Sequence, residues 1–335
     1  MVLQRQMSDP IWGIADPGEH VAVRINGQTK ITDAAPDGRW QVRLDPMEAG
    51  GPYDLTVTGN NVIAVHNVMV GEVWLASGQS NMALNTPMRR FRVQYPNVRT
   101  FKRKGWADKP AGTAFWFGAE LNKALGITVG LLNQAVAGST ISQWLGPAAM
   151  SDPDPQVENL IGGLGSFGLV YNARIVPFQP YAIRGAIWWQ GESNALFPTS
   201  YSHLLPALIR SWRDAWGEGD FPFFFVQLPI GGGLQTNQLP LALPANPPID
   251  TALPTFANTF YESLAVPNTG MVISLDLPRA LHPQDKQDYG LRFARLALAT
   301  VYGEKDMVYS GPVFESMARE GNRLRLRFRH NTAPA

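Results

Sequence analysis

Residues 1–68 alternate apolar and polar positions in short runs, and turn-forming residues separate the runs. Two separators, Asn26-Gly27 and Asp37-Gly38, are dipeptides typical of tight hairpin turns. A period of two residues indicates strands with one buried face. The apolar members of three runs are Val21, Val23 and Ile25, then Trp40, Val42 and Leu44, then Tyr53, Leu55 and Val57. The pattern predicts a small antiparallel, sandwich-like β domain over residues 1–68, in which Trp12 and Trp40 are either buried or serve as platforms for a sugar ring.

From residue 69 the pattern changes to apolar runs without alternation, separated by stretches with helical spacing. Such runs form strands that are buried on both faces, as in a parallel sheet covered by helices. The predicted strands are Val70–Ala76, Ile127–Leu132, Ala182–Trp189, Phe223–Gln227 and Met271–Leu275. Predicted helices contain Leu204 to Trp216, Phe256 to Leu264 and Tyr289 to Val301. We therefore predict an α/β domain over residues 69–305.

Three segments do not follow either pattern. Residues 150–168 and 231–248 are irregular and contain many glycines and prolines, so we predict loops that wall a ligand site near the carboxyl ends of the strands. Residues 306–335 return to a short β segment, in which arginine stands at every second position from Arg323 to Arg329. We expect these arginines to form one solvated face of a strand.

Composition limits the possible functions. The chain has 335 residues, a formal net charge of +1 and 16% charged residues, so no strong field attracts nucleic acid or an anionic membrane. No run approaches the ~18 apolar residues of a membrane span. The absence of cysteine excludes disulfides and thiolate chemistry, and no clustered His and carboxylate residues indicate a metal site or cofactor. A neutral or mixed-charge substrate is expected, and the oligomeric state stays open.

A candidate nucleophile follows the first strand of the α/β domain. The run Val70–Ala76 leads into a turn that contains Gly78 and presents Ser80. A serine hydroxyl acts as a nucleophile where a base and oxyanion donors lie nearby, and a strand-to-helix turn supplies exposure and backbone N–H groups. The turn is not a G-x-S-x-G elbow, because Met82 occupies the position of the second glycine. From these residues alone Ser80 is either a nucleophile or a turn and capping residue.

A candidate base stands out among the five histidines. His282 follows a predicted strand and precedes a predicted helix, whereas the other four are His20, His66, His203 and His330. An imidazole with a pKa near neutrality serves as a general base, although a lone histidine is more often structural.

Three segments follow one another along the chain as distinct motifs. They are GEVWLASGQSNM at Gly71–Met82, WWQGESNA at Trp188–Ala195 and LHPQDK at Leu281–Lys286. They resemble motifs of the sialate O-acetylesterase family, carbohydrate esterases of the SGNH hydrolase superfamily. The resemblance implies an SGNH-hydrolase-like fold for residues 69–305, with the β domain before it. It also implies a serine esterase in which Ser80 is the nucleophile and His282 is the base.

The same resemblance implies an oxyanion hole with donors from separate loops. Its members would be the backbone N–H groups of Ser80 and Gly138 and a side-chain amide from the loop that follows Trp189. We assign that amide to Gln190. SGNH enzymes in general use an asparagine in this block, so Asn194 is the rival.

The third member of the triad is where the chain departs from the family. SGNH enzymes usually have an aspartate three residues before the histidine, but this position is Arg279. Asp276 is the nearest acid upstream, and it follows a predicted strand on the same short loop as His282. We therefore expect Asp276 to hold the imidazole, with Glu192 as a substitute. A backbone carbonyl in a Ser-His dyad is the third option.

The function that the resemblance implies is removal of O-acetyl groups from a carbohydrate, with sialate as the expected sugar. The alternatives are an esterase for acetylxylan or another acyl-sugar, and a non-catalytic carbohydrate-binding protein with a degenerate site. The family implies a periplasmic or secreted protein. Residues 1–5 lack the pattern of a signal peptide, so a cytoplasmic location stays open.

Overall fold

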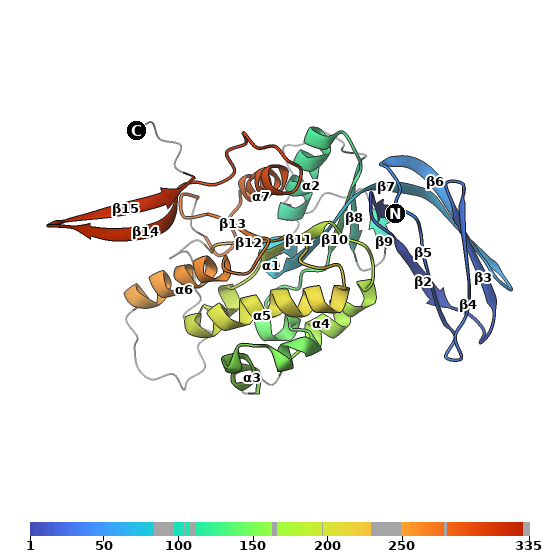
Figure 1. The fold of residues 1–335 in the computed structure, drawn as a ribbon, viewed down its shortest axis with the longest axis horizontal. Coiled ribbons are helices and arrows are strands. Elements are labelled where there is room, and N and C mark those ends of the chain that lie inside the picture. The colour runs from blue at the N-terminus through green and yellow to red at the C-terminus, as the bar shows by residue number, and fades with distance from the viewer. Residues whose placement is uncertain are drawn as a thin grey trace.

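A central parallel sheet organises the molecule (Figure 1). The computed structural model describes residues 1–83, 95, 97–102, 105–107, 112–162, 166–195, 197–228, 249–277 and 280–330. The strand order is β13-β12-β11-β7-β10-β8-β9, and all neighbours are parallel except β8 and β9. The bounds are β7 Val62–Gly78, β8 Val98–Lys102, β9 Gly105–Ala107, β10 Val129–Asn133, β11 Gly185–Trp189, β12 Phe223–Val226 and β13 Thr269–Val272. Five of these overlap the predicted apolar runs, although β13 shares only Met271 and Val272 with its run, whereas β8 and β9 were not predicted.

Helices cover both faces of this sheet, which confirms the predicted α/β class. Figure 1 shows α2 and α7 on one side of the strands and α3, α4 and α5 on the other. The bounds are α1 Ser80–Ala83, α2 Gly112–Leu125, α3 Pro155–Gly162, α4 Leu169–Arg174, α5 Pro198–Trp216, α6 Ile249–Ser263 and α7 Lys286–Thr300. Between α5 and the sheet, the fully buried rings of Trp188, Trp212 and Phe223 make edge and tilted contacts. The aromatic spacing of the sequence therefore marks the core of the domain.

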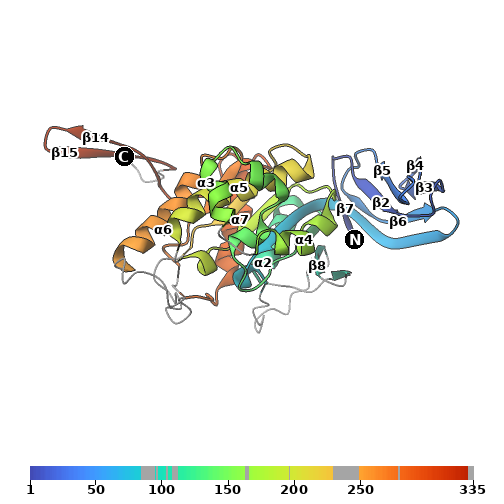
Figure 2. The same ribbon diagram turned by 90° about the horizontal axis from the view of Figure 1, so that it is seen from below.

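Short strands form the N-terminal part; the first pairs in parallel with β7, and the others pair antiparallel. Their bounds are β1 Val2–Gln4, β2 Pro10–Ile14, β3 His20–Ile25, β4 Gln28–Asp33, β5 Arg39–Arg43 and β6 Gly50–Thr58. One sheet joins β3, β4, β6 and the first half of β7, and β2 pairs separately with β5. The second half of β7 enters the parallel sheet between β10 and β11 (Figure 2). The expected boundary between residues 68 and 69 therefore lies inside one continuous strand.

The two segments that were predicted to be loops differ in what the structure describes. Residues 150–168 were predicted to be a loop, but they contain α3. The prediction failed because the apolar residues at helical spacing, Val157, Leu160 and Ile161, cover little more than one turn. Val157 and Ile161 are buried. Residues 231–248 lie outside the described residues. No helix in the described part of the chain is long and apolar enough to cross a bilayer.

The C-terminal segment forms a hairpin of β14 (Val313–Glu320) and β15 (Arg323–Arg329) that extends away from the body (Figure 1). Arginine alternates with apolar residues in β15, as the sequence predicted. The apolar face is also exposed, because Leu324 and Phe328 keep 62% and 42% of their accessible surface.

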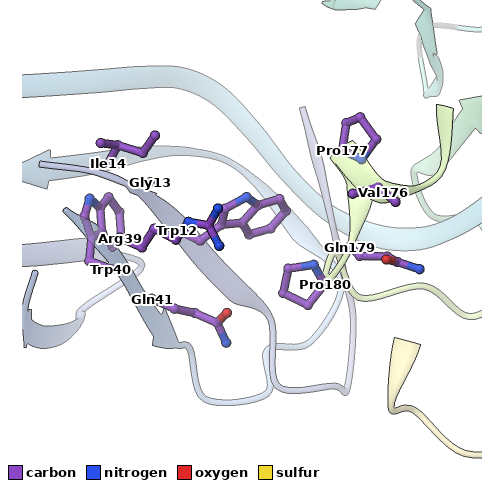
Figure 3. Close-up of a pocket in the computed structure, with 10 residues that line it drawn as sticks. All are labelled: Trp12, Gly13, Ile14, Arg39, Trp40, Gln41, Val176, Pro177, Gln179 and Pro180. Carbon is purple, nitrogen blue, oxygen red and sulfur yellow. The ribbon is translucent and has the colours of Figure 1, made fainter. Parts of the chain in front are cut away.

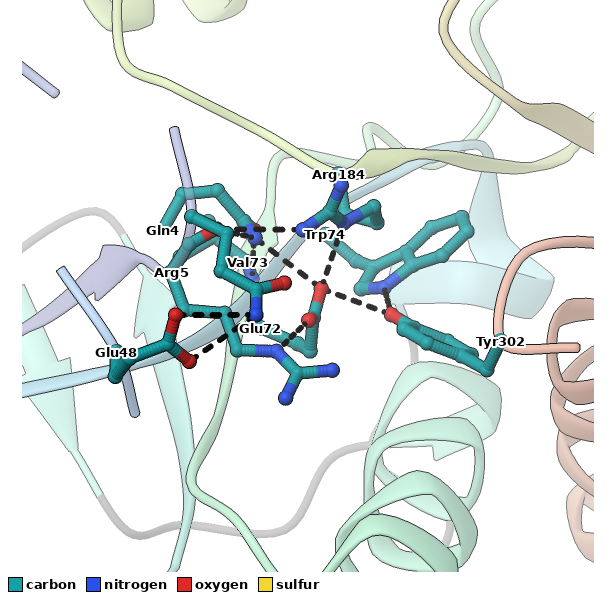
Figure 4. A network of polar contacts seen from close by, with 9 residues as sticks. Gln4, Arg5, Glu48, Glu72, Val73, Trp74, Arg184 and Tyr302 are labelled. Carbon is teal, nitrogen blue, oxygen red and sulfur yellow. Dashed lines mark hydrogen bonds and ion pairs between the residues drawn. The ribbon is translucent and has the colours of Figure 1, made fainter. Parts of the chain in front are cut away.

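A buried carboxylate joins the two parts of the chain at the start of the parallel sheet (Figure 4). The side chain of Glu72 has no exposed surface, and it forms ion pairs with Arg5 and with Arg184, whose Nε lies 3.0 Å away. Tyr302 donates its hydroxyl to the same carboxylate at 2.9 Å. Because buried charges need partners, these bonds tie the N-terminal residues to β7 and to the residues after α7.

Candidate functional site

Ser80 lies where β7 ends, at the first residue of the short helix α1. Gly78 has φ +122° just before it, and a Cβ there would lie 2.1 Å from the carbonyl oxygen of Trp189. Only glycine fits this close approach of β7 to β11. The N–H of Gln79 then donates to the same carbonyl at 2.8 Å. This local geometry presents Ser80, which is 8% exposed, at the carboxyl edge of the sheet.

His282 meets Ser80 from the segment that precedes α7. Its Nε2 lies 2.9 Å from Ser80 Oγ, although the two residues are 202 positions apart. Burial, and to a smaller extent the positive charge of Lys286, lowers the pKa of His282 below its ordinary value. A neutral imidazole at hydrogen-bond distance from a hydroxyl is the arrangement that general-base activation requires.

The backbone N–H groups of the two predicted oxyanion donors have no acceptor among the described residues. One belongs to Ser80 itself, because the first N–H groups of a helix have no intrahelical partner. The other belongs to Gly138, which has φ +73° in the loop after β10. Bonds from Gln134 to Ala76 and from Val136 to Gly78, both 2.9 Å, hold this loop beside the end of β7. Free donors of this kind suit an oxyanion.

The two candidate side-chain amides differ in what they already bind. Gln190 is fully buried, and its Nε2 donates to the carbonyl of Ser139 at 3.1 Å and to Asn194 Oδ1 at 2.7 Å. Asn194 Oδ1 also accepts from the N–H of Ile141 at 3.0 Å. Its Nδ2 has no acceptor within the described part of the chain, so Asn194 has a free donor and Gln190 does not. This geometry favours Asn194 and departs from the assignment to Gln190.

Asp276 does not contact His282. Its two carboxylate oxygens accept from Arg292 of α7 at 2.7 Å and 2.5 Å, and its side chain is 63% exposed. The hydrogen bonds from Arg292 hold the pKa of Asp276 below its usual value. The expectation that Asp276 orients the imidazole therefore needs correction, because an arginine on a later helix binds this carboxylate instead.

Glu192 also lies apart from the imidazole. Its Oε1 accepts from Asn81 Nδ2 at 2.5 Å and from Trp189 Nε1 at 3.1 Å, and burial raises its pKa. Across the described residues, no carboxylate or carbonyl bonds to Nδ1 of His282. None of the three expected partners of the imidazole is therefore seen among these residues, and the observed contact is the Ser80–His282 pair alone.

We predict that Asp276→Asn leaves kcat for a chromogenic acetate within a few-fold of wild type. The substitution removes a partly exposed ion pair, so the free energy of unfolding should fall by at most ~1 kcal/mol. Initial rates and denaturant unfolding check this prediction. A loss of several orders of magnitude in kcat with an intact fold would contradict this prediction and show that Asp276 supports catalysis.

Asn81 has a role that the sequence reasoning missed. Its Nδ2 donates to the carbonyl of Leu281 at 2.9 Å as well as to Glu192, and its Oδ1 accepts from Lys286 Nζ at 2.5 Å. The ammonium of Lys286 lies 4.5 Å from the ring centre of Trp189, and burial lowers its pKa to about 8. The residue after Ser80 thus bonds directly to the residue before His282. Both Asn81 and Lys286 stand in the motifs quoted above, which was the available signal.

A cavity of about 730 Å³ opens beside this centre, and we call it the Ala83 cavity. Ala83 follows Ser80 by one helical turn, and Ala137 precedes Gly138. These two residues line one part of the cavity, and Lys102, Trp106 and Arg174 line another. Ser80 and His282 do not themselves line the cavity, so its relation to the nucleophile rests on Ala83 and Ala137.

Comparisons with known proteins agree with this chemistry. Residues 100–243 match the family model described as carbohydrate esterase, sialic acid-specific acetylesterase. The chain is 28% identical to the sialate O-acetylesterases of Rattus norvegicus and Homo sapiens, over 93% and 95% of its length and 74% and 72% of theirs. It is also similar to the crystal structure of a carbohydrate acetylesterase from Xanthomonas citri. That match has a TM-score of 0.83 and 31% identity, and it covers 98% of this chain and 79% of the other.

Proposed function

This chain belongs to the carbohydrate esterase family that contains the sialate O-acetylesterases, and we propose that it deacetylates its substrate with Ser80 as nucleophile and His282 as base. The observation that carries the proposal is the 2.9 Å contact between His282 Nε2 and Ser80 Oγ. The free N–H groups of Ser80 and Gly138 support it, because an acyl-transfer site needs donors where negative charge develops.

The reaction proceeds in two half-reactions. Ser80 Oγ attacks the carbonyl carbon of the acetyl ester while its proton passes to His282 Nε2. The tetrahedral oxyanion accepts hydrogen bonds from the N–H groups of Ser80 and Gly138 and from Asn194 Nδ2. The imidazolium then gives its proton to the sugar oxygen as the C–O bond breaks, leaving acetyl-Ser80. Water attacks this ester with His282 again as base, which releases acetate and restores the hydroxyl.

Positioning of the imidazole falls to the Asn81 contacts rather than to a triad acid. Asn81 links the nucleophile turn to the carbonyl of Leu281, and Lys286 and Glu192 hold the two ends of its amide. Removing one partner would leave buried polar groups unpaired, which costs about 1–3 kcal/mol for each group. The network therefore fixes the distance between the serine and histidine segments.

The substrate is an acetylated carbohydrate, and we propose a sialate or another acyl-sugar such as acetylated xylan. Release of acetate from a small chromogenic acetate tests the chemistry. Comparison of acetylated sialic acid with acetylated xylan then separates the sugars. Failure of the folded wild-type protein to release acetate from all three would contradict the proposed function.

The pH dependence should follow His282. The imidazole acts as a base only when neutral, and its pKa is lowered from the ordinary 6.5 by burial and by Lys286. We therefore expect the acidic limb of kcat/KM to have its midpoint below pH 6.5. A pH–rate profile with the chromogenic acetate measures this acidic limb. A midpoint above 6.5 would contradict this prediction, because it would mean that the surroundings raise the pKa of His282.

A further inference from the structure

A second concave site lies between the β domain and the α/β domain, far from Ser80. It has a volume of about 650 Å³, and we call it the Trp12 groove. One wall comes from β2 and β5, and the other comes from residues 176–180, just before β11 (Figure 3). Its lining includes Trp12, Arg39, Gln41, Val176 and Gln179.

Trp12 presents an aromatic surface in this groove. Its indole is 37% exposed, whereas Trp40 on the neighbouring strand is only 9% exposed. Figure 3 shows the indole of Trp12 extending from β2 toward Gln179 and Pro180. An edge contact with Tyr181, at 6.2 Å between ring centres and 88° between planes, holds the ring in place. A fixed ring loses little conformational freedom when a ligand stacks on it.

The polar groups of the groove are suited to hydroxyl groups. Gln41 is exposed on β5, and Gln179 presents a second amide, which bonds to the hydroxyl of Tyr171 at 3.1 Å. The charge of Arg39 already has a carboxylate neighbour, because its Nε lies 3.6 Å from Asp37. A partly exposed indole beside amides that donate and accept matches an uncharged sugar ring, which offers C–H groups on its faces and hydroxyl groups at its edges.

The groove is too distant to hold the acetylated sugar unit itself. Trp12 contacts Tyr181, whose hydroxyl donates to the carbonyl of Val2, and Val2 pairs with Met69 of β7. From Met69 to Gly78 the strand rises roughly 30 Å at about 3.3 Å per residue. A ligand that touches both Trp12 and the region of Ser80 must therefore be a chain of several sugar units.

One segment carries both sites. Arg174 lines the Ala83 cavity, and Val176 lines the Trp12 groove. Their Cα atoms lie at most ~7 Å apart along an extended chain. The end of α4 therefore contributes a residue to the cavity and the segment just after it contributes one to the groove.

We propose that the Trp12 groove binds unacetylated, uncharged units of a polysaccharide whose acetyl groups are removed at Ser80. This proposal rests on the proposed function and names its substrate class as a polymer rather than a single sugar. The groove would retain the chain while successive acetyl groups reach the catalytic serine.

The test uses xylohexaose, an uncharged and unacetylated oligosaccharide, titrated into the full chain by calorimetry. We expect binding, and we expect Trp12→Ala to weaken it about tenfold. For acetylated xylan, Trp12→Ala should raise KM by a similar factor, while kcat/KM for the chromogenic acetate stays within twofold of wild type. Phe314→Ala, which removes an exposed ring on the C-terminal hairpin, is the matched control and should change none of these values.

Gln41→Ala provides a second test if Trp12→Ala proves unstable, because an exposed glutamine can be removed without disturbing the core. The proposal is overturned if xylohexaose does not bind, or if the folded variants bind it within twofold of wild type. A wild-type dimer that Trp12→Ala dissociates, without xylohexaose binding, would instead assign the groove to a second copy. Binding without turnover of the chromogenic acetate would refute the proposed function and leave the groove assignment intact.

Discussion

Replacing Ser80 by alanine should reduce acetate release by at least about 10⁴-fold, to near the uncatalysed rate. The substitution removes the atom that carries the acetyl group, and no other described hydroxyl bonds to His282. The side chain of Ser80 is small and, among the described residues, bonds only to the imidazole, so the melting temperature should change little. Initial rates with the chromogenic acetate, measured beside a thermal melt, check both parts.

Covalent labelling provides the control for this experiment. An organophosphate should label Ser80 in the wild-type protein, and His282→Ala should suppress the labelling, because an unactivated hydroxyl reacts slowly. A folded protein that binds sugar but never labels at Ser80 would instead be a carbohydrate-binding protein with a degenerate site. Retention of wild-type turnover by Ser80→Ala would place the nucleophile elsewhere.

Replacing Asn194 by aspartate should lower kcat by about 10²–10³-fold, which corresponds to ~2.7–4 kcal/mol of transition-state stabilisation. Aspartate keeps the oxygen that accepts from Ile141 and Gln190, but it exchanges the free Nδ2 donor for a second oxygen. That oxygen would also repel the developing oxyanion. Because the acceptor contacts survive, kcat should fall much more than the melting temperature.

Gln190→Met is the matched comparison, because methionine has a similar shape and lacks both polar atoms of the side-chain amide. It removes the bonds to Ser139 and Asn194, so we expect a larger fall in melting temperature and a smaller fall in kcat than for Asn194→Asp. The reverse order of effects on kcat would restore Gln190 as the oxyanion donor.

The sequence predicted the sheet better than the polar contacts of the site. Apolar runs without alternation locate buried strands because burial on both faces leaves no polar positions. The strand β8, VRTFK, contains polar residues and is only partly buried, and β9 has three residues, so neither gives such a run. The expected pairing of Ser80 with His282 rested on family motifs, and the structure brings these residues together.

The identity of the remaining partners depends on side chains that meet only in the folded chain. Asp276 follows a strand on the loop of His282, as expected, but no sequence pattern indicates that Arg292 will bind its carboxylate. Gln190 and Asn194 stand four residues apart and offer the same amide group. Only the bonds from Gln190 Nε2 to Ser139 and to Asn194 itself distinguish them.

The continuity of β7 restricts how the chain can change in length. Successive side chains of a strand point to opposite faces, so inserting one residue reverses every side chain on one side of the insertion. An insertion near Val68 would either exchange the faces on which Val70 and Val73 are packed or break the pairing with β6. The junction between the two parts thus tolerates no change in spacing, and an exchange of β domains between related esterases would have to preserve the residue count from β6 to Ser80.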